Sequence, residues 1–83
     1  MKITVKFYST LSKFLPENAK SNVGEITVAD GASVKDVADT LGIATNMIHL
    51  TLVNGVYVAP SDLGGQPLKE GDTLAMWPPL AGG

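Results

Sequence analysis

The chain has 83 residues, of which 45% are hydrophobic, and it carries six lysines, no arginine, no cysteine and a formal net charge of −2. This is the size of one small domain with a single core. The lack of arginine and of a basic patch argues against nucleic-acid binding, and the lack of cysteine excludes a disulfide framework and a thiolate nucleophile. We see no signal peptide and no hydrophobic run long enough to span a bilayer, so we expect a cytoplasmic protein that binds no membrane.

Alternation at the N-terminus predicts a first strand over residues 2–8. One of its faces consists of three hydrophobic residues, Ile3, Val5 and Phe7. Tyr8 falls on the other face, with the polar residues. A helical turn is possible over residues 10–15, where Pro16 would end it, and a second short strand is expected over residues 25–28.

The clearest helix begins after Ser33. Ser33 is a typical N-cap residue, and Asp36 three positions later completes a carboxylate version of the capping box. Hydrophobic residues follow at helical spacing, at positions Val34, Val37, Ala38 and Leu41. Gly42 stands where a left-handed residue ends a helix, and Ile43 can make the hydrophobic contact that accompanies such an end.

Three short strands are predicted in the second half of the chain. Residues 51–53 and 56–58 flank Asn54-Gly55, a strong signal for a two-residue hairpin turn. Residues 73–77 form the last strand, and Pro78-Pro79 cannot continue its hydrogen bonding. Because a crossover helix precedes these strands, the last one can lie parallel to the first.

This order of elements predicts an α+β fold, a two-layer roll in which one main helix packs on a mixed sheet of four to five strands. We expect residues 1–77 to form the domain and residues 78–83 to form a flexible C-terminal tail.

The side chains offer no credible catalytic constellation. His49 is the single histidine, and Asp36 and Asp39 are three positions apart on the predicted helix, where they are expected to face solvent. No glycine-rich loop carries the lysine and hydroxyl residue of a phosphate site. We therefore expect neither an enzyme nor a bound metal or cofactor.

The remaining reactive group is the α-carboxylate of Gly83. A carboxylate becomes an acylating agent when it is converted to an acyl adenylate, and attack by sulfide or by a persulfide then gives a thiocarboxylate. Glycine at positions 82 and 83 has no Cβ to obstruct a narrow tunnel. Pro78 and Pro79 stiffen the approach, which reduces the entropy lost when a partner holds the tail.

Several segments together resemble the MoaD/ThiS family of ubiquitin-like sulfur carriers. They read ITVKFY at residues 3–8, LVNG at 52–55, LKEGDTLA at 68–75 and PPLAGG at 78–83. The double proline before Gly-Gly is more similar to MoaD, the small subunit of molybdopterin synthase. The resemblance implies the β-grasp fold, which agrees with the order of elements above.

The resemblance also implies a set of partners. A ubiquitin-activating-type adenylyltransferase (MoeB/ThiF-like) would use ATP to adenylate Gly83, and a persulfide would donate sulfur. The tail, consisting of Pro78, Pro79, Leu80, Ala81 and Gly82 before Gly83, would insert into a MoaE-like large subunit. Sulfur would then pass to a pterin precursor of the molybdenum or tungsten cofactor.

Two aromatic residues are candidates for the docking face. If Leu74 and Met76 fill the core, Trp77 points outward, and Tyr8 on the neighbouring first strand does the same. Trp and Tyr are enriched at binding hot spots. We therefore expect Tyr8 and Trp77 to form an exposed patch at the base of the tail, where they anchor partners together with Leu80.

Three other functions remain open from the residues alone. The chain could supply sulfur for thiamine thiazole, cysteine or another metabolite. It could be a ubiquitin-like modifier that joins Gly83 to a lysine of a target protein. It could also be an interaction domain in which Gly-Gly has no chemical role.

Overall fold

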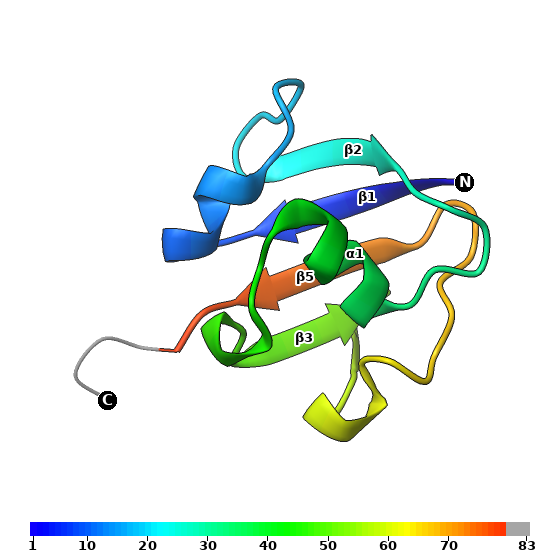
Figure 1. The fold of residues 1–83 in the computed structure, drawn as a ribbon. Coiled ribbons are helices and arrows are strands. Elements are labelled where there is room, and N and C mark those ends of the chain that lie inside the picture. Colours follow the sequence, from blue (N-terminus) through cyan, green and yellow to red (C-terminus); the bar gives the residue numbers. More distant parts are fainter. Residues whose placement is uncertain (80–83) are drawn as a thin grey trace.

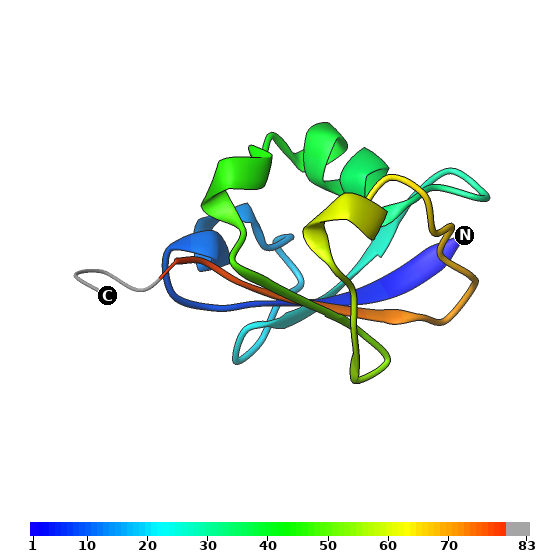
Figure 2. The ribbon, with the colours of Figure 1, turned by 90° about the horizontal axis from the view of Figure 1, so that it is seen from below.

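A five-stranded mixed sheet with one α-helix across one face forms the body of the chain (Figures 1 and 2). The structure is a computed structural model and describes residues 1–79. The strands lie in the order β2-β1-β5-β3-β4, and their bounds are β1 Lys2–Phe7, β2 Val23–Thr27, β3 Leu50–Val53, β4 Val56–Tyr57 and β5 Thr73–Trp77. The predicted α+β fold is confirmed.

The pairing of the central strands also agrees with the sequence prediction. β1 pairs antiparallel with β2 and parallel with β5, so Val5 lies opposite Leu74 and Phe7 opposite Met76. β3 pairs antiparallel with both β5 and β4. The parallel pair requires a crossover connection, and α1 lies within it.

Helix α1 spans Val34–Leu41 and has the two ends that its sequence predicts. The Ser33 hydroxyl accepts the Asp36 N–H at 3.1 Å, and the Asp36 carboxylate accepts the Ser33 N–H at 3.0 Å. Gly42 adopts φ +82° at the C-terminal end, and the Ile43 N–H donates to the Ala38 carbonyl at 2.8 Å. Both capping predictions are confirmed.

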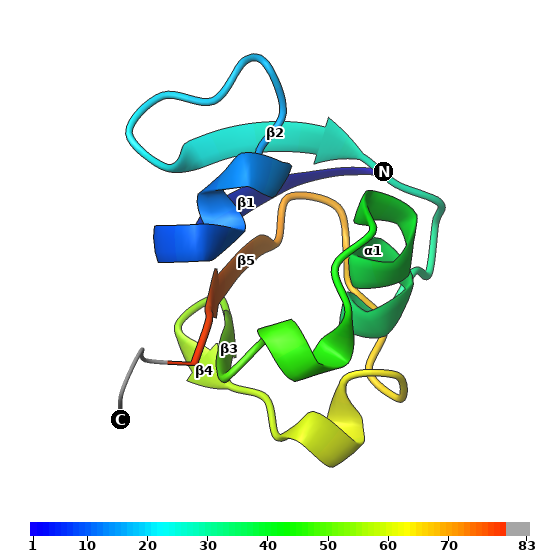
Figure 3. The ribbon, with the colours of Figure 1, turned by 60° about the vertical axis from the view of Figure 1, so that its left-hand side comes forward.

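Three short 3₁₀ helices connect these elements: η1 Ser9–Phe14, η2 Thr45–Met47 and η3 Pro60–Asp62. The helical turn expected near residues 10–15 is η1. It lies beside the C-terminal part of β5 (Figure 3). Figure 2 shows α1, η2 and η3 on the same side of the sheet.

Four of the five strands differ from their predicted bounds by one or two residues, and β5 alone matches at both ends. β1 ends at Phe7, because Ser9 has φ +52° and turns the chain into η1. β2 starts at Val23 instead of residue 25, because its register places Val23 opposite Lys6 and Gly24 opposite Val5. The exact length of a strand follows from the partner it pairs with, so local pattern does not define it.

The core lies between the sheet and α1. Its fully buried side chains include Ile3, Val5, Phe7, Leu11, Val34, Val37, Ile43, Leu74 and Met76. The residues predicted to face the core from β1 and β5 are all among them. The Asn54-Gly55 hairpin is also confirmed, since these residues have φ +53° and +81°.

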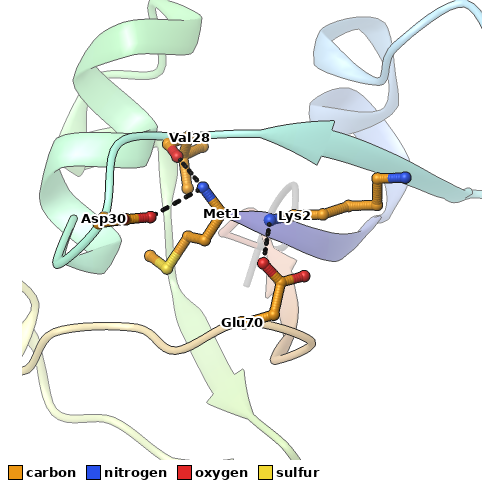
Figure 4. Close-up of polar contacts among 5 residues, drawn as sticks. All are labelled: Met1, Lys2, Val28, Asp30 and Glu70. Atoms are coloured by element: carbon orange, nitrogen blue, oxygen red, sulfur yellow. Dashed lines mark hydrogen bonds and ion pairs between the residues drawn. The ribbon is translucent and has the colours of Figure 1, made fainter.

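The start of β1 is fixed by polar contacts to two loops (Figure 4). The Met1 ammonium donates to the Val28 carbonyl at 2.7 Å and to the Asp30 carboxylate at 3.1 Å. The Lys2 N–H donates to the Glu70 carboxylate at 3.1 Å. These contacts lie at the end of the sheet opposite the C-terminal end of β5.

Candidate functional site

Tyr8 and Trp77 stack on each other where β1 and β5 end. Their ring centroids are 4.7 Å apart and the ring planes are inclined by 10°. Phe7 pairs with Met76 across the parallel strands, so the next residue of each strand comes to the same edge of the sheet. The structure thus brings together the two residues that the sequence indicated.

Backbone hydrogen bonds from three elements hold this aromatic pair. The Tyr8 N–H donates to the Met76 carbonyl at 3.3 Å, and the His49 N–H donates to the Trp77 carbonyl at 2.7 Å. The Leu11 N–H donates to the Tyr8 carbonyl at 3.0 Å as η1 begins. These hydrogen bonds fix the position of the C-terminal end of β5, where the segment after Trp77 begins.

The aromatic pair is half-buried, which is less exposed than the patch expected from the sequence. Each ring covers one face of the other, and this lowers the surface that each offers to solvent. Trp77 nevertheless lies outside the cluster of core residues. The pair is a compact and partly exposed surface feature.

The two prolines after β5 differ in burial. Pro78 is buried in the body of the domain and Pro79 is exposed. A buried Pro78 extends the rigid part of the chain by one residue, so its insertion into a partner stays a prediction. The predicted roles of the other tail residues, Leu80, Ala81, Gly82 and Gly83, lie outside the described residues.

The face around the aromatic pair continues across the sheet. Leu50 lies opposite Trp77, and Leu52 lies between Ala75 on β5 and Tyr57 on β4. Lys6 pairs with Ala75 from the other side. Tyr57 is 58% exposed. We define the open-face row as Tyr57, Leu52, Ala75 and Lys6.

Sequence reasoning missed Leu50, Leu52 and Tyr57 as parts of this face. The signal was present, because Leu50 and Leu52 alternate with Val53 in residues 50–53, so both faces of this strand carry apolar residues. Which face stays open follows only from the position of α1.

The other charged candidates have structural partners. Asp36 belongs to the capping box, and the hydrogen bond that its carboxylate accepts from the Ser33 N–H is the largest cause of its lowered pKa. Asp39 accepts a hydrogen bond from Lys35 Nζ at 2.8 Å. Within residues 1–79 no three carboxylate or histidine side chains lie close enough together to hold a metal ion. Across the same residues, no helix has the length and hydrophobicity to cross a membrane.

The fold defines a class, the ubiquitin-like β-grasp domains. The family model described as Mut7-C ubiquitin matches residues 1–81. The chain therefore belongs to the Mut7-C ubiquitin family. No curated protein sequence matches it.

Similar solved structures cover the whole chain. SAMP1 from Haloferax volcanii is 25% identical over 100% of both chains, with a TM-score of 0.67. The HVO 2177 protein of the same organism is 27% identical over 100% of this chain and 87% of its own, with a TM-score of 0.75. A chain from the complex of subunits 1 and 2 of the molybdopterin-converting factor of Helicobacter pylori is 20% identical over 100% of both chains, with a TM-score of 0.59, and shares the fold. The resemblance to the MoaD/ThiS family of ubiquitin-like proteins is confirmed by the ubiquitin-like family model and by the shared fold.

Proposed function

We propose that this chain is a sulfur carrier whose terminal glycine, Gly83, is converted to a thiocarboxylate. The carrier itself supplies no catalytic side chain in this scheme. Its domain presents the tail, and partner enzymes carry out the chemistry.

The chemistry requires two steps at Gly83. Its carboxylate attacks the α-phosphorus of ATP in an activating enzyme of the MoeB/ThiF type, which gives the acyl adenylate and releases pyrophosphate. A persulfide then attacks the acyl carbon and displaces AMP. A second thiol cleaves the resulting S–S bond, so that one sulfur stays on Gly83 and the donor leaves as a disulfide.

One observation carries the proposal: the aromatic pair stands at the root of the segment that ends in Gly-Gly. The parallel pairing of β1 and β5 fixes Trp77 beside Tyr8, and Pro79 is the first exposed residue after β5. A partner that grips this pair receives the tail at a defined position. Glycine at 82 and 83 suits a channel too narrow for a Cβ atom.

We further propose that the acceptor of the sulfur is a pterin precursor, with a MoaE-like subunit as the partner. The Helicobacter pylori chain that shares this fold was solved in complex with the second subunit of the molybdopterin-converting factor. The Pro-Pro-x-x-Gly-Gly ending supports the same branch. Transfer to thiazole, cysteine or another metabolite is the alternative within sulfur chemistry.

A second function, protein modification, has its own support. SAMP1 of Haloferax volcanii is 25% identical to this chain over the full length of both. The abbreviation SAMP1 stands for small archaeal modifier protein 1. In that role the activated Gly83 would acylate a lysine of a target protein, forming an isopeptide bond and releasing the activating group.

Intact mass spectrometry of the protein isolated from its native host tests the proposal. We expect a fraction in which one oxygen is replaced by sulfur, and loss of that fraction when Gly82 and Gly83 are deleted. The same spectrum measures whether Gly83 carries the terminal carboxylate, which the proposal requires. Two results together would refute the carrier function: a spectrum without a sulfur-bearing fraction, and sulfur transfer that continues fully with the chain that lacks Gly82 and Gly83.

Covalent adducts of other proteins, detected by blotting in the same cells, distinguish the modifier from the carrier. A ladder that disappears with the truncation and survives loss of the large subunit supports modification. Pterin sulfuration in a reconstituted mixture with a MoaE-like subunit supports the molybdopterin branch.

A further inference from the structure

A cavity of about 490 Å³ opens on the helix side of the sheet, on the face opposite the open-face row. Its walls come from the start of α1, from η2, from β3 and from η3. Figure 2 shows these three helices gathered above the sheet. The volume falls within the range of small-molecule sites, which is about 300–1,000 Å³.

The floor of the cavity is apolar. Val58 and Leu63 belong to the core, being 4% and 6% exposed, and Ile48 packs against the same cluster. An apolar group of a ligand placed here would bury surface against side chains that are already fixed. This part of the site favours an aliphatic body.

One polar group on this floor, the Thr51 hydroxyl, has no hydrogen-bond partner in the part of the chain that the structure describes. Thr51 is 2% exposed, yet none of the side-chain hydrogen bonds found within residues 1–79 involves it. Every fully buried side-chain oxygen and nitrogen in that range has a partner, so the Thr51 hydroxyl reaches solvent, and the cavity that Thr51 lines is where it does so. Because the Thr51 hydroxyl faces the cavity, it can donate a hydrogen bond to a ligand there or accept one from it.

Lys35 is the residue that gives the cavity walls a formal charge at neutral pH. They include Lys35 and His49 but none of the eight acidic residues of the chain. The Lys35 N–H donates to the Leu63 carbonyl at 2.9 Å, which fixes the base of this side chain at the rim. A Cβ on Gly64 would lie 3.6 Å from the Lys35 Cδ, so the lysine stem passes directly over Gly64.

Lys35 keeps its charge at neutral pH. Asp39, outside the cavity, accepts a hydrogen bond from Lys35 Nζ at 2.8 Å, and this bond raises the pKa of the ammonium. An ammonium has three donors, and the bond to Asp39 uses one of them.

We propose that this cavity binds a small amphiphilic carboxylate, with the carboxylate at Lys35, an aliphatic group on the Val58 and Leu63 floor, and a polar group hydrogen-bonded to Thr51. An N-acylated aliphatic amino acid has this chemistry, and so does the C-terminal residue of a peptide. Neither Tyr8 nor Trp77 lines this cavity, although the His49 N–H in its wall donates to the Trp77 carbonyl. Ligand binding here is measured without any sulfur chemistry, so it is tested independently of the sulfur-carrier proposal.

Titration of the ¹⁵N-labelled protein with N-acetyl-leucine, followed by NMR, tests the site. We expect chemical-shift changes that saturate and that centre on Ile48, Thr51 and Leu63. N-acetyl-leucinamide, which lacks the charge, and N-acetylglycine, which lacks the aliphatic group, should each bind about tenfold more weakly. Equal shifts with all three compounds, or shifts that do not saturate, would overturn the proposal.

Two variants identify the residues that carry binding. Lys35→Gln should weaken N-acetyl-leucine binding about tenfold, and Thr51→Val should weaken it severalfold, by about the worth of one hydrogen bond. Lys69→Gln removes an exposed lysine that is not part of the cavity and should leave binding unchanged. Thermal unfolding of each variant shows that the fold is retained. Unchanged affinity in both Lys35→Gln and Thr51→Val would contradict the assignment.

A peptide ending in leucine distinguishes the two sources of this chemistry. If N-acetyl-leucine binds as tightly as the peptide, the ligand is a free small molecule. If the peptide binds more tightly, the ligand is the C-terminus of a polypeptide.

Discussion

Trp77 lies where β5 ends, with its ring stacked at 4.7 Å on that of Tyr8 and part of its surface open to solvent. Half-buried aromatic residues of this kind supply large, rigid contact area at little entropic cost. The stack orients the Trp77 ring before any partner arrives. At the scale of single residues, this pair is the feature most closely connected to the proposed function.

Trp77→Ala is expected to weaken binding to the activating enzyme by at least about tenfold while the domain stays folded, because loss of a hot-spot residue costs about 2 kcal/mol or more of binding free energy. Calorimetric titration with that enzyme measures this effect. Val56→Ala removes an apolar residue that is 67% exposed on β4 and serves as the control. Unchanged affinity in Trp77→Ala, or unfolding of this variant, would count against the role of the pair.

The contribution of the stack to stability is a separate prediction. In a double-mutant cycle, Tyr8→Ala and Trp77→Ala should show a coupling free energy of about 0.5–1.5 kcal/mol. Urea unfolding of the four proteins gives this value. Strict additivity of the two substitutions would mean that the rings lie together without stabilising each other.

Gly24 is a residue that close packing requires. A Cβ at this position would lie 2.6 Å from the Cγ of Pro16, whose ring cannot rotate away. Gly24→Ala should therefore destabilise the domain by about 1–3 kcal/mol. Gly65, where an added Cβ meets nothing within 4 Å, provides the matched control, and its replacement by alanine should change stability little. Urea unfolding of both variants distinguishes a steric cause from a general effect of replacing glycine.

Among the elements, α1 owes its position to its two ends. The capping box at Ser33 satisfies N–H groups that the first turn leaves without partners, and Gly42 allows the chain to reverse at the C-terminal end. The helix has eight residues, which is too short to be stable alone. Its caps and its packing on the sheet are therefore both needed.

Ser33→Ala should destabilise the domain by about 0.5–2 kcal/mol, the usual cost of losing an N-cap hydroxyl. Ser33 is 5% exposed, so water cannot replace the lost acceptor easily. Thermal unfolding measures the change. Ser12→Ala, at an exposed serine of η1, should have almost no effect, and equal losses in the two variants would disprove the capping role.

The same cap predicts a pH dependence. Its hydrogen bonds lower the pKa of Asp36 in the folded state below the ordinary aspartate value of 3.8. A lowered folded-state pKa means that the stabilisation is fully present above the unfolded pKa and is lost as the pH falls through the folded pKa. Unfolding free energies measured from pH 6 down to about pH 2 should therefore fall less steeply for Asp36→Asn than for the native chain. Identical slopes would show that Asp36 does not contribute.

At the scale of the whole molecule, the parallel pair β1–β5 connects the two ends of the sequence. β1 starts the chain, β5 is its last strand, and together they occupy the centre of the sheet. Both proposed sites depend on this arrangement. The aromatic pair forms where the two strands end. The cavity forms on the face of the sheet opposite the open-face row, because α1, η2 and η3 all lie on that side (Figure 2).

Hydrogen exchange should reflect this central position. Amides of β1 and β5, such as those of Val5 and Leu74, are expected to exchange only by global unfolding, because both residues are fully buried. The amide of Asp62 in η3, which lies in an exposed connection, should exchange much faster through local opening. Exchange measured by NMR checks the order. Similar protection at these amides would indicate that the structure opens only as one unit.

The sequence was sufficient to predict the elements whose signals are local. Ser33, Asp36 and Gly42 mark the ends of α1 because caps depend on residues a few positions apart. Asn54-Gly55 marks the hairpin because few other residue pairs adopt two positive φ angles. Alternation in residues 2–8 and 73–77 indicated which side chains face the core, and the meeting of Tyr8 and Trp77 followed from the predicted parallel pairing.

Other features depend on contacts between residues far apart in the chain. The start of β2 at Val23, the burial of Pro78 and the open face over Leu52 and Tyr57 are fixed by strand register and by the position of α1. The cavity beside Thr51 likewise gathers residues from four elements. The sequence by itself thus determined the elements and the Gly-Gly ending, because their signals lie in residues close together in the chain. It also determined the fold class, which follows from the order of those elements. Only the tertiary structure decided which surfaces remain open and which polar groups lack a partner, because these depend on how distant segments pack.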